Sequence, residues 1–444
     1  MAIRALSVVL FCVAGALSSR DRGTAGRLEL EFAGCARVRP GPVCELGRRR
    51  ELTLWVPGAE KPQLGAAARV RRAKLVESGW QLLLDVAPAA RVLRVRAGER
   101  WAELRIAESS EPARLRELAE LWRDGHWEQV RATLDAAEAE LEGPERERIA
   151  AFRARLALRD GDNARAASEL ERTAKSAQNA GLLLEAGQDR FAAAYVRTVR
   201  LGQYEHARLE LDATAELDAV PEVRARLAYH RGILARTTGD TQGALTELRE
   251  ASVRSRRLDL VADELTARQE LALMLNRLHR HAEALAEQEA VVARDAELPS
   301  CVDALRWENL SWILLSQPEP SLERAAVALD RVESLQPRCP DPLSRRNQAL
   351  NRVQLALLRG ELTNAATLLR ALEGDATGRS TRLAAWQALY SGKLWLARKE
   401  GSRAVAAFER AAALAESARL LDCGYLAKLG RARALAQRGD SDSV

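Results

Sequence analysis

The residues of this chain that are best suited to metal binding or catalysis are its histidines and cysteines. The five histidines are His126, His206, His230, His279 and His281. Two metal ligands on one helix face are expected at i and i+4, or at i and i+3. His279 and His281 are two residues apart and point in different directions. The cysteines include no Cys-x-x-Cys pair. We therefore predict no metal site.

Nucleophilic chemistry has no stronger candidate. A Cys/His pair would have to bring His279 or His281 beside Cys301 or Cys339, but all four residues fall in segments with a helical pattern. The sequence has no Gly-x-Ser-x-Gly elbow and no Walker-type phosphate loop. Carboxylates are spread over expected helix surfaces, so no pair stands out as acid and base. The sequence predicts a protein that is not an enzyme and needs no cofactor.

A repeated pattern of turn and packing residues, rather than a reactive constellation, dominates the chain from about residue 112. The turn positions, 36 to 41 residues apart, are Gly125, Gly161, Gly202, Gly239, His279, Pro320, Gly360, Gly401 and Gly439. Five residues after the first eight stand Val130, Ala166, Ala207, Ala244, Ala284, Ala325, Ala365 and Ala406. Nine residues after six of them stand Leu134, Leu170, Leu211, Leu248, Leu329 and Leu369. A fixed period of this kind predicts an array of helix pairs.

Each offset has a physical reason. The glycine ends the first helix of a pair, where a left-handed residue caps the last carbonyl groups at little cost. The small residue lies where the second helix crosses the first, because a larger side chain would push the helices apart. The leucine one turn later fills the space between successive pairs. No pair can bury its apolar face alone, so stacking of pairs supplies the core.

The arrangement resembles the tetratricopeptide repeat, in which a turn glycine precedes an alanine at the start of the second helix. The segments Gly202-Gln-Tyr204-Glu-His-Ala207 and Gly125-His-Trp127 match that motif closely, and Gly232 and Ala272 match the small residue of the first helix. The departures are His279 and Pro320 in place of glycine, and Gln288 and Arg410 in place of the apolar residue. The period is also nearer 40 than the family's value of about 34 residues.

This resemblance implies a mainly α, tetratricopeptide-like α-solenoid of about eight helix pairs plus a terminal helix over residues 111–444. It also implies that the first helices line a concave groove that holds a protein or peptide. The positions carried over to that face are Arg226, Tyr229, Arg236, Gln269, Asn276, Arg277, Trp307, Asn347 and Gln354. Arginine and large aromatic residues are typical binding anchors. The alternative for each residue is a solvated or locally paired side chain.

The N-terminal part of the chain has a different organisation. Residues 1–16 combine one positive charge, an apolar stretch and Ala14-x-Ala16, which indicates a secretory signal peptide. The alternative is an unprocessed hydrophobic first strand or helix. Residues 17–26 are polar and form an expected linker. With the signal peptide the protein would be exported to the periplasm or cell surface, and without it the protein would be cytoplasmic.

Residues 27–110 have the alternation of β-strands. Segments such as Leu28–Phe32 and Leu52–Val56 alternate with period two between turns that contain proline and glycine. This predicts five or six short strands in a small antiparallel β-sandwich-like module. Cys35 and Cys44 lie close together within it and could form a disulfide in an oxidising compartment.

The charge distribution constrains the partner. The net charge is +6, but residues 1–110 carry 19 Lys and Arg against 11 Asp and Glu, so the excess lies outside the repeats. A helical array that binds nucleic acid would show a basic stripe, so we predict a protein or peptide partner and no nucleic acid. We also expect no transmembrane segment in the mature chain, and self-association stays open.

A second resemblance concerns the whole layout. The segment from Gly34-Cys35 to Cys44-Glu-Leu, followed by Leu52-Thr-Leu-Trp55-Val56, a β module and helical repeats, looks like the front half of myxobacterial proteins that end in a caspase-like CHAT peptidase domain. No such domain follows in these 444 residues. Two functions therefore stand at this point: a non-enzymatic binding scaffold, or the sensor half of a CHAT-type peptidase whose catalytic domain lies outside this chain.

Overall fold

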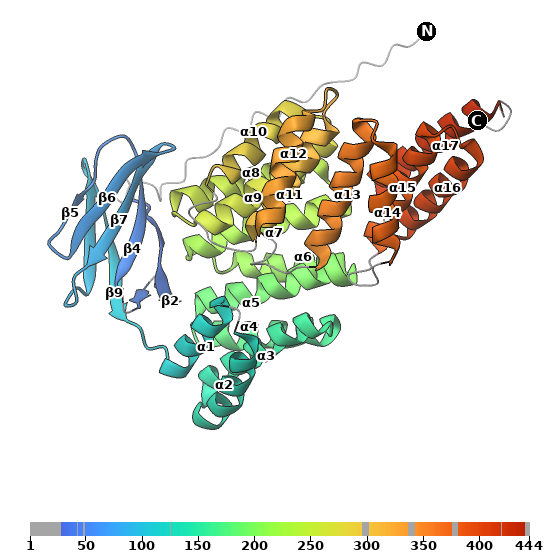
Figure 1. Cartoon of the computed structure of the whole chain (residues 1–444). Coiled ribbons are helices and arrows are strands. Elements are labelled where there is room, and N and C mark those ends of the chain that lie inside the picture. The colour runs from blue at the N-terminus through green and yellow to red at the C-terminus, as the bar shows by residue number, and fades with distance from the viewer. Residues whose placement is uncertain are drawn as a thin grey trace, which may run out of the picture. The chain divides into compact units, whose positions relative to one another are not determined.

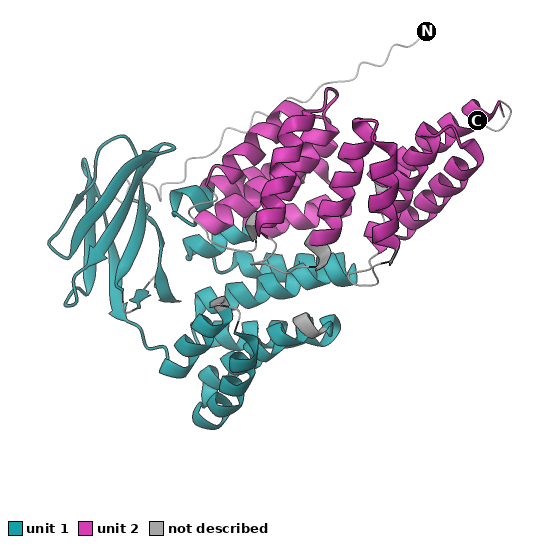
Figure 2. Ribbon diagram, in the orientation of Figure 1, with its two compact units in different colours: residues 1–227, 254–260 teal, residues 228–253, 261–444 magenta. Residues whose placement is uncertain are grey.

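The computed structural model describes residues 28–41, 43–47, 49–124, 126–294, 302–335, 342–374, 381–418 and 420–439. The expected signal peptide and linker, as well as Gly125, Cys301 and Cys339, lie outside these residues. The described chain runs through nine strands and then through helices to its C-terminal part (Figure 1). It divides into two compact units (Figure 2). The first unit extends to Leu227 and includes Arg254–Leu260, and the second comprises Ala228–Val253 and the residues from Val261 onward.

The strands form two sheets in the first unit. They are β1 (Glu31–Ala33), β2 (Cys35–Arg39), β3 (Val43–Leu46), β4 (Glu51–Pro57), β5 (Gln63–Leu64), β6 (Ala68–Val76), β7 (Gly79–Val86), β8 (Val92–Ala97) and β9 (Arg100–Glu108). One sheet has the order β1-β4-β7-β6 and the other β2-β3-β9-β8-β5. The sequence predicted five or six strands, and the described residues form nine. All pairs are antiparallel except β3 and β9, which run parallel.

The core of this sandwich is made of alternate residues on the strands. Leu52, Leu54, Leu82, Leu84 and Leu93 are almost completely buried, as expected for the inner faces of packed sheets. Cys35 and Cys44 form a disulfide between the start of β2 and β3, with 5.4 Å between their Cα atoms.

One sheet is covered on its outer face as well, because the C-terminal end of helix α8 (Thr241–Arg257) packs against it. The Arg257 guanidinium lies 4.3 Å from the centre of the Trp55 ring. The Nε2 atom of Gln81 donates hydrogen bonds to the carbonyl oxygens of Arg256 and Arg257, at 2.6 and 2.8 Å. These carbonyls belong to the last turn of α8, where intrahelical partners are missing. The contact helps to explain why β4 is buried continuously from Leu52 to Val56 instead of on alternate residues.

A buried arginine fixes the other sheet to the helices of the first unit. Arg37 on β2 is fully buried. Its two terminal nitrogens donate to the carboxylate of Glu145, at 2.8 and 2.7 Å, and its Nε lies 3.2 Å from Oε1 of Glu185. Beside it, Nη1 of Arg39 donates to the carbonyl oxygen of Ala180 at 2.9 Å. The strand module and these helices therefore share one packed unit.

The α-helices lie in antiparallel pairs through both units. They are α1 (Ala113–Asp124), α2 (Trp127–Glu140), α3 (Gly143–Asp160), α4 (Asn163–Asn179), α5 (Leu183–Tyr195), α6 (Tyr204–Ala215), α7 (Pro221–Thr238), α8, α9 (Val261–Arg277), α10 (His281–Val292), α11 (Val302–Ser316), α12 (Leu322–Leu335), α13 (Pro342–Leu358), α14 (Leu362–Gly374), α15 (Thr381–Ala397), α16 (Gly401–Ser417) and α17 (Leu421–Arg438). A π-helical segment, η2 (Val196–Leu201), extends α5. This confirms the predicted fold class of a tetratricopeptide-like α-solenoid behind a small β module.

The predicted turn and packing residues occupy the expected places in most pairs. The left-handed residues that end first helices include Gly161, Gly202, Gly239 and Gly360, and His279 adopts the same conformation with a φ of 57°. The residues five positions after the predicted turn positions are completely buried in seven repeats. They are Val130, Ala166, Ala207, Ala244, Ala284, Ala325 and Ala365. Gln288, which replaces the apolar residue, is also buried and donates from Nε2 to the carbonyl oxygen of Arg306 at 2.8 Å.

The prediction was wrong for the turn between α15 and α16. The left-handed residue there is Lys399, with a φ of 60°, whereas Gly401 is the first residue of α16. The offsets therefore shift by two residues. Ala404 takes the small position, fully buried, and Phe408 takes the large apolar position in place of Arg410. Ala406 is exposed. This pair consequently follows the repeat pattern more closely than the sequence indicated.

We expect Lys399→Gly to raise the free energy of unfolding by about 1 kcal/mol, because a left-handed conformation is costly for a residue with a Cβ and free for glycine. Gly360→Ala is the matched control, since Gly360 has the same role in the preceding pair with a φ of 75°. That variant should lose stability. Urea denaturation followed by circular dichroism measures both changes, and a Lys399→Gly protein that is less stable than the wild type would contradict the assignment.

Candidate functional site

All nine residues predicted for the binding face lie on the first helices of pairs, namely α7, α9, α11 and α13. Eight of them belong to the second unit, and Arg226 belongs to the first. Within the second unit, α9, α11, α13, α15 and α17 contact one another in that order. They form a continuous layer, which we call the first-helix layer.

The amide residues of the predicted set connect helices of the array to one another. Oδ1 of Asn276 lies 3.0 Å from Nδ1 of His281 on α10. Gln354 on α13 donates to the carbonyl oxygen of Leu315 at 3.2 Å and accepts a hydrogen bond from the Tyr390 hydroxyl at 2.7 Å. Gln269 is buried, and its Oε1 has no hydrogen-bond partner among the described residues. Asn276 therefore joins the two helices of one pair, and Gln354 joins α13 to the first helices on either side of it.

The two predicted aromatic anchors also contribute to packing. Tyr229 lies against the buried cluster of Ala228, Ala251 and Ala267, and Trp307 lies against the cluster around Leu310 and Leu314. Both rings are half-buried, so their removal would disturb the core as well as any binding surface.

The remaining predicted residues differ in their surroundings. Asn347 is half-buried on α13. Arg226 is half-buried on α7, with Nη2 3.8 Å from Oε2 of Glu222 one turn earlier.

Arg236 and Arg277 take part in a charged group built from four helices of the second unit. Arg236 on α7 forms an ion pair with Glu270 on α9. Nε of Arg277, at the end of α9, lies 3.7 Å from Oδ2 of Asp422 in the first turn of α17. Arg382, in the first turn of α15, is exposed and close enough to act electrostatically on Arg277. We call these five residues the arginine cluster.

The electrostatics of the arginine cluster favour an anion. Burial lowers the pKa of the Arg277 guanidinium; Asp422 opposes this shift, while Arg236 and Arg382 add to it. The cluster combines three guanidinium groups, which stay charged at any ordinary pH, with the two carboxylates of Glu270 and Asp422. A carboxylate or phosphate from a ligand would relieve the repulsion and could form the two-pronged hydrogen bonds that guanidinium groups make.

Reactive groups near this layer are poorly suited to chemistry. Cys423 is fully buried, and burial raises the pKa of its thiol to about 12, so little thiolate exists at neutral pH. Burial, reinforced by His279, lowers the pKa of His281 below its ordinary value. Among the residues that the structure describes, no group of three or more His, Cys, Asp and Glu side chains could hold a metal ion.

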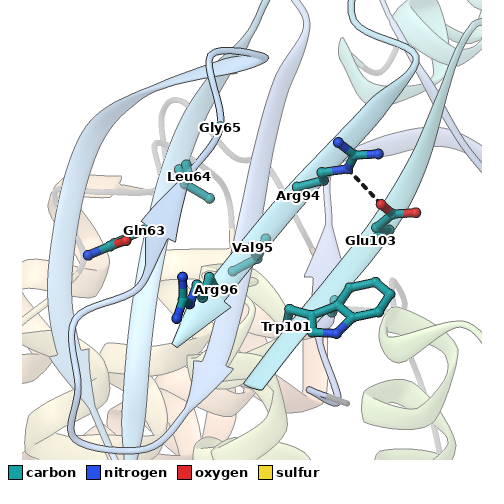
Figure 3. A pocket seen from close by; sticks show the side chains of 9 residues that line it. Gln63, Leu64, Gly65, Arg94, Val95, Arg96, Trp101 and Glu103 are labelled. Carbon is teal, nitrogen blue, oxygen red and sulfur yellow. Dashed lines mark hydrogen bonds and ion pairs between the residues drawn. The ribbon is translucent and has the colours of Figure 1, made fainter. Parts of the chain in front are cut away.

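A second candidate site lies on the strand module, far from the predicted residues in the sequence. A shallow hollow of about 460 Å³ is lined by residues of β5, β8 and β9, including Gln63, Arg94, Arg96, Trp101 and Glu103. Figure 3 shows these side chains on one face of the sheet, with Arg94 paired to Glu103. Trp101 is 54% exposed and so presents part of a large flat apolar ring to solvent.

No helix within the described ranges has the length and apolar character needed to cross a membrane.

The chain matches no family model and no curated protein. Solved structures with a similar backbone arrangement include RapI in its apo form, with a TM-score of 0.45 and 10% identity over 74% of this chain and 86% of that chain. A Rap protein complexed with competence and sporulation factor gives a TM-score of 0.46 and 13% identity over 74% and 98%. A tetratricopeptide repeat protein from Parabacteroides merdae gives 0.40 and 15% over 59% and 98%.

Sequence reasoning identified two members of the arginine cluster and missed the other three. Arg382 and Asp422 lie more than 100 residues from Arg277, and nothing in a single sequence links them. The hollow had a weak signal, since the alternation of β9 already placed Trp101 on the same face as Glu103.

Proposed function

We propose that this chain is a non-enzymatic scaffold whose first-helix layer holds a peptide or protein segment that carries acidic side chains. The arginine cluster is the observation that supports this most directly. It brings together three arginines and two carboxylates from α7, α9, α15 and α17, so one positive charge remains without a carboxylate within the cluster. A rigid array that presents such a group can bind an acidic segment without a large change of its own shape.

The amide and aromatic residues of the predicted set have a supporting part in this proposal. Because Gln354 joins α13 to α11 and to α15, it helps to fix the spacing of the first helices that carry Arg277 and Arg382, while Asn276 holds α9 against α10. Specificity would then depend on guanidinium groups at a defined separation, and the rest of the layer would supply shape.

Export of the protein is part of the same proposal. The disulfide between Cys35 and Cys44 supports it, because such bonds persist in oxidising compartments outside the cytoplasm. The relationship to CHAT-type peptidases stays a prediction from the sequence.

The test is binding of fluorescein-labelled decapeptides from acid-rich, neutral and basic libraries, measured by fluorescence anisotropy. Acid-rich peptides should bind best. Arg277→Gln combined with Arg382→Gln should weaken their binding by about 100-fold or more, because each lost charged hydrogen bond contributes about 1.5–3 kcal/mol. Higher salt should weaken binding to the wild type in the same direction.

Arg431→Gln is the matched control for this test. Arg431 lies on α17 and pairs with Glu409 at 2.9 Å on an exposed surface, so its loss should leave binding unchanged. The proposal fails if basic peptides bind as well as acidic ones, or if the double variant keeps wild-type affinity with unchanged circular dichroism.

A further inference from the structure

The outer face of the β8–β9 hairpin carries a row of side chains that crosses three strands. Strand register places Gln63 of β5 opposite Arg96 of β8, and Arg96 opposite Trp101 of β9. Neighbouring strands are about 4.8 Å apart, so the row extends over about 10 Å. Figure 3 shows the three side chains in this order on the same face. A second row, two residues along, pairs Arg94 with Glu103 at 2.6 Å.

The hollow above these rows continues into a neighbouring one. The second hollow, of about 440 Å³, is lined by Glu60, Lys61, Gln63, Arg96 and Gly98. Both hollows are lined by Gln63 and Arg96, so they adjoin at the edge of the sheet, and we call the two together the depression. Two adjoining hollows can hold successive units of a chain.

From these features we propose that the depression binds a glycan, with one sugar ring stacked on Trp101. The apolar C–H face of a sugar ring covers an exposed indole, which has a large flat apolar surface and a polar edge. The hydroxyl groups of the same ring both donate and accept hydrogen bonds. The lining meets that requirement, because Arg96 and Lys61 are donors, Glu60 and Glu103 are acceptors, and Gln63 is both.

Other ligand classes fit the lining less well. A single-stranded nucleic acid would stack on Trp101 but needs a consistently basic groove, and the carboxylates of Glu60 and Glu103 interrupt this one. An added peptide strand needs a long free edge, whereas β5 has only two residues. A proline-rich segment would need a groove with several aromatic residues, and Trp101 is the only aromatic among the residues that line either hollow.

This site is independent of the proposed scaffold function. The hollows belong to the first unit, whereas Arg236, Arg277 and Arg382 belong to the second. Loss of glycan binding would therefore leave binding of acidic peptides unchanged, and failure of either proposal would not affect the other. Together they would make the chain a protein that recognises a glycan with one unit and a protein with the other.

The test uses saturation-transfer difference NMR with cellohexaose, chitohexaose and hexagalacturonate, followed by calorimetric titration of any oligosaccharide that binds. We expect at least one of the three to bind, and Trp101→Ala to weaken that binding by about tenfold or more. Gln63→Ala, which leaves the indole in place, should weaken it by a smaller factor. Trp101→Phe should retain part of the affinity, because it keeps an aromatic face.

Tyr425→Ala is the matched control, because Tyr425 is an aromatic residue of the second unit and is 69% exposed. It should bind the oligosaccharide like the wild type. Circular dichroism and the thermal midpoint show whether Trp101→Ala remains folded. If all three oligosaccharides fail to bind, if binding survives in both Trp101→Ala and Gln63→Ala, or if a thymidine decanucleotide binds in place of every glycan, the proposal is wrong.

Discussion

Phe408→Ala is expected to lower the free energy of unfolding by about 3–5 kcal/mol, the usual cost of removing a buried phenylalanine. Phe408 lies on α16 and is only 1% exposed. Its ring fills the space between α15 and α17, where Gly392 and Gly430 face it. A methyl group at Gly392 would lie 2.6 Å from the ring, and one at Gly430 would overlap it. The ring therefore occupies space that both neighbouring helices leave open.

The converse substitution should also destabilise the protein. Gly→Ala within a helix normally stabilises by about 1 kcal/mol, but Gly430→Ala should cost about 1–3 kcal/mol because the core is already filled. Gly424→Ala is the matched control on the same helix. A methyl group there would lie 3.7 Å from Cβ of Ala415, an ordinary contact, so this variant should gain stability.

Urea denaturation of the wild type and these variants, followed by circular dichroism, decides between these expectations. Phe408→Leu combined with Gly430→Ala should be more stable than the sum of the two single changes predicts, because the smaller side chain makes room for the methyl group. Equal effects of Gly430→Ala and Gly424→Ala would show that Phe408 does not fill this space.

The same residues show what a single sequence can predict about this fold. The period of the turns and the alanines identified the helix pairs, because each pair must repeat the same crossing and the same cap. The turn between α15 and α16 was assigned to Gly401 instead of Lys399, because glycine favours the left-handed conformation. Lysine can adopt it too, at a cost that tertiary packing offsets. Because the turn was placed two residues too late, the offset of nine residues pointed to Arg410 instead of Phe408.

The candidate sites were less accessible than the fold. Repeat position placed Arg277 on a first helix, but its neighbour Asp422 comes from a helix more than 100 residues later. Position also could not distinguish Arg277, which has a partly compensated charge, from Gln354, whose amide is used in hydrogen bonds to Leu315 and Tyr390. Both are polar residues on first helices, and only the packing of the array shows which one stays available to a partner.

The second large effect is expected at Arg37, whose replacement by methionine should cost about 3–5 kcal/mol near neutral pH. Arg37 is fully buried and pairs with Glu145 and Glu185. The methionine would fill much of the same volume but would leave the buried carboxylate of Glu185 and the half-buried one of Glu145 without their cation, and removal of one partner of a buried pair has a cost of this size.

The loss should depend on pH. Burial raises the pKa of Glu185, while Arg148 and Arg37 oppose the shift. A carboxyl group whose pKa is raised in the folded state contributes stability at low pH that is lost as the pH rises through the folded pKa. Without Arg37 that pKa rises further. The deficit relative to the wild type should therefore be larger at about pH 8 than at about pH 5, because Glu185 takes up a proton more readily as the pH falls.

Arg208→Met is the matched control, because Arg208 lies on α6 of the same unit and pairs with Glu205 on an exposed surface. It should cause no measurable change at either pH. Thermal and urea midpoints at the two pH values measure stability. Limited proteolysis followed by mass spectrometry should show cleavage between β9 and α1 in Arg37→Met before it appears in the wild type.

The reason to expect a large effect is that Arg37 belongs to a repeated arrangement. Glu145, Glu185 and Glu222 lie in the first turns of α3, α5 and α7, where a carboxylate is also favoured by the helix dipole. The strand module binds all three, through Arg37 and through the backbone N–H of Gly34, which donates to Oε1 of Glu222 at 3.0 Å. The module thus connects three successive repeats at equivalent positions. Glu145→Gln with Glu185→Gln should restore much of the stability of Arg37→Met, because neutral amides no longer need the cation; if it does not, the lost stability has a source other than unpaired charge.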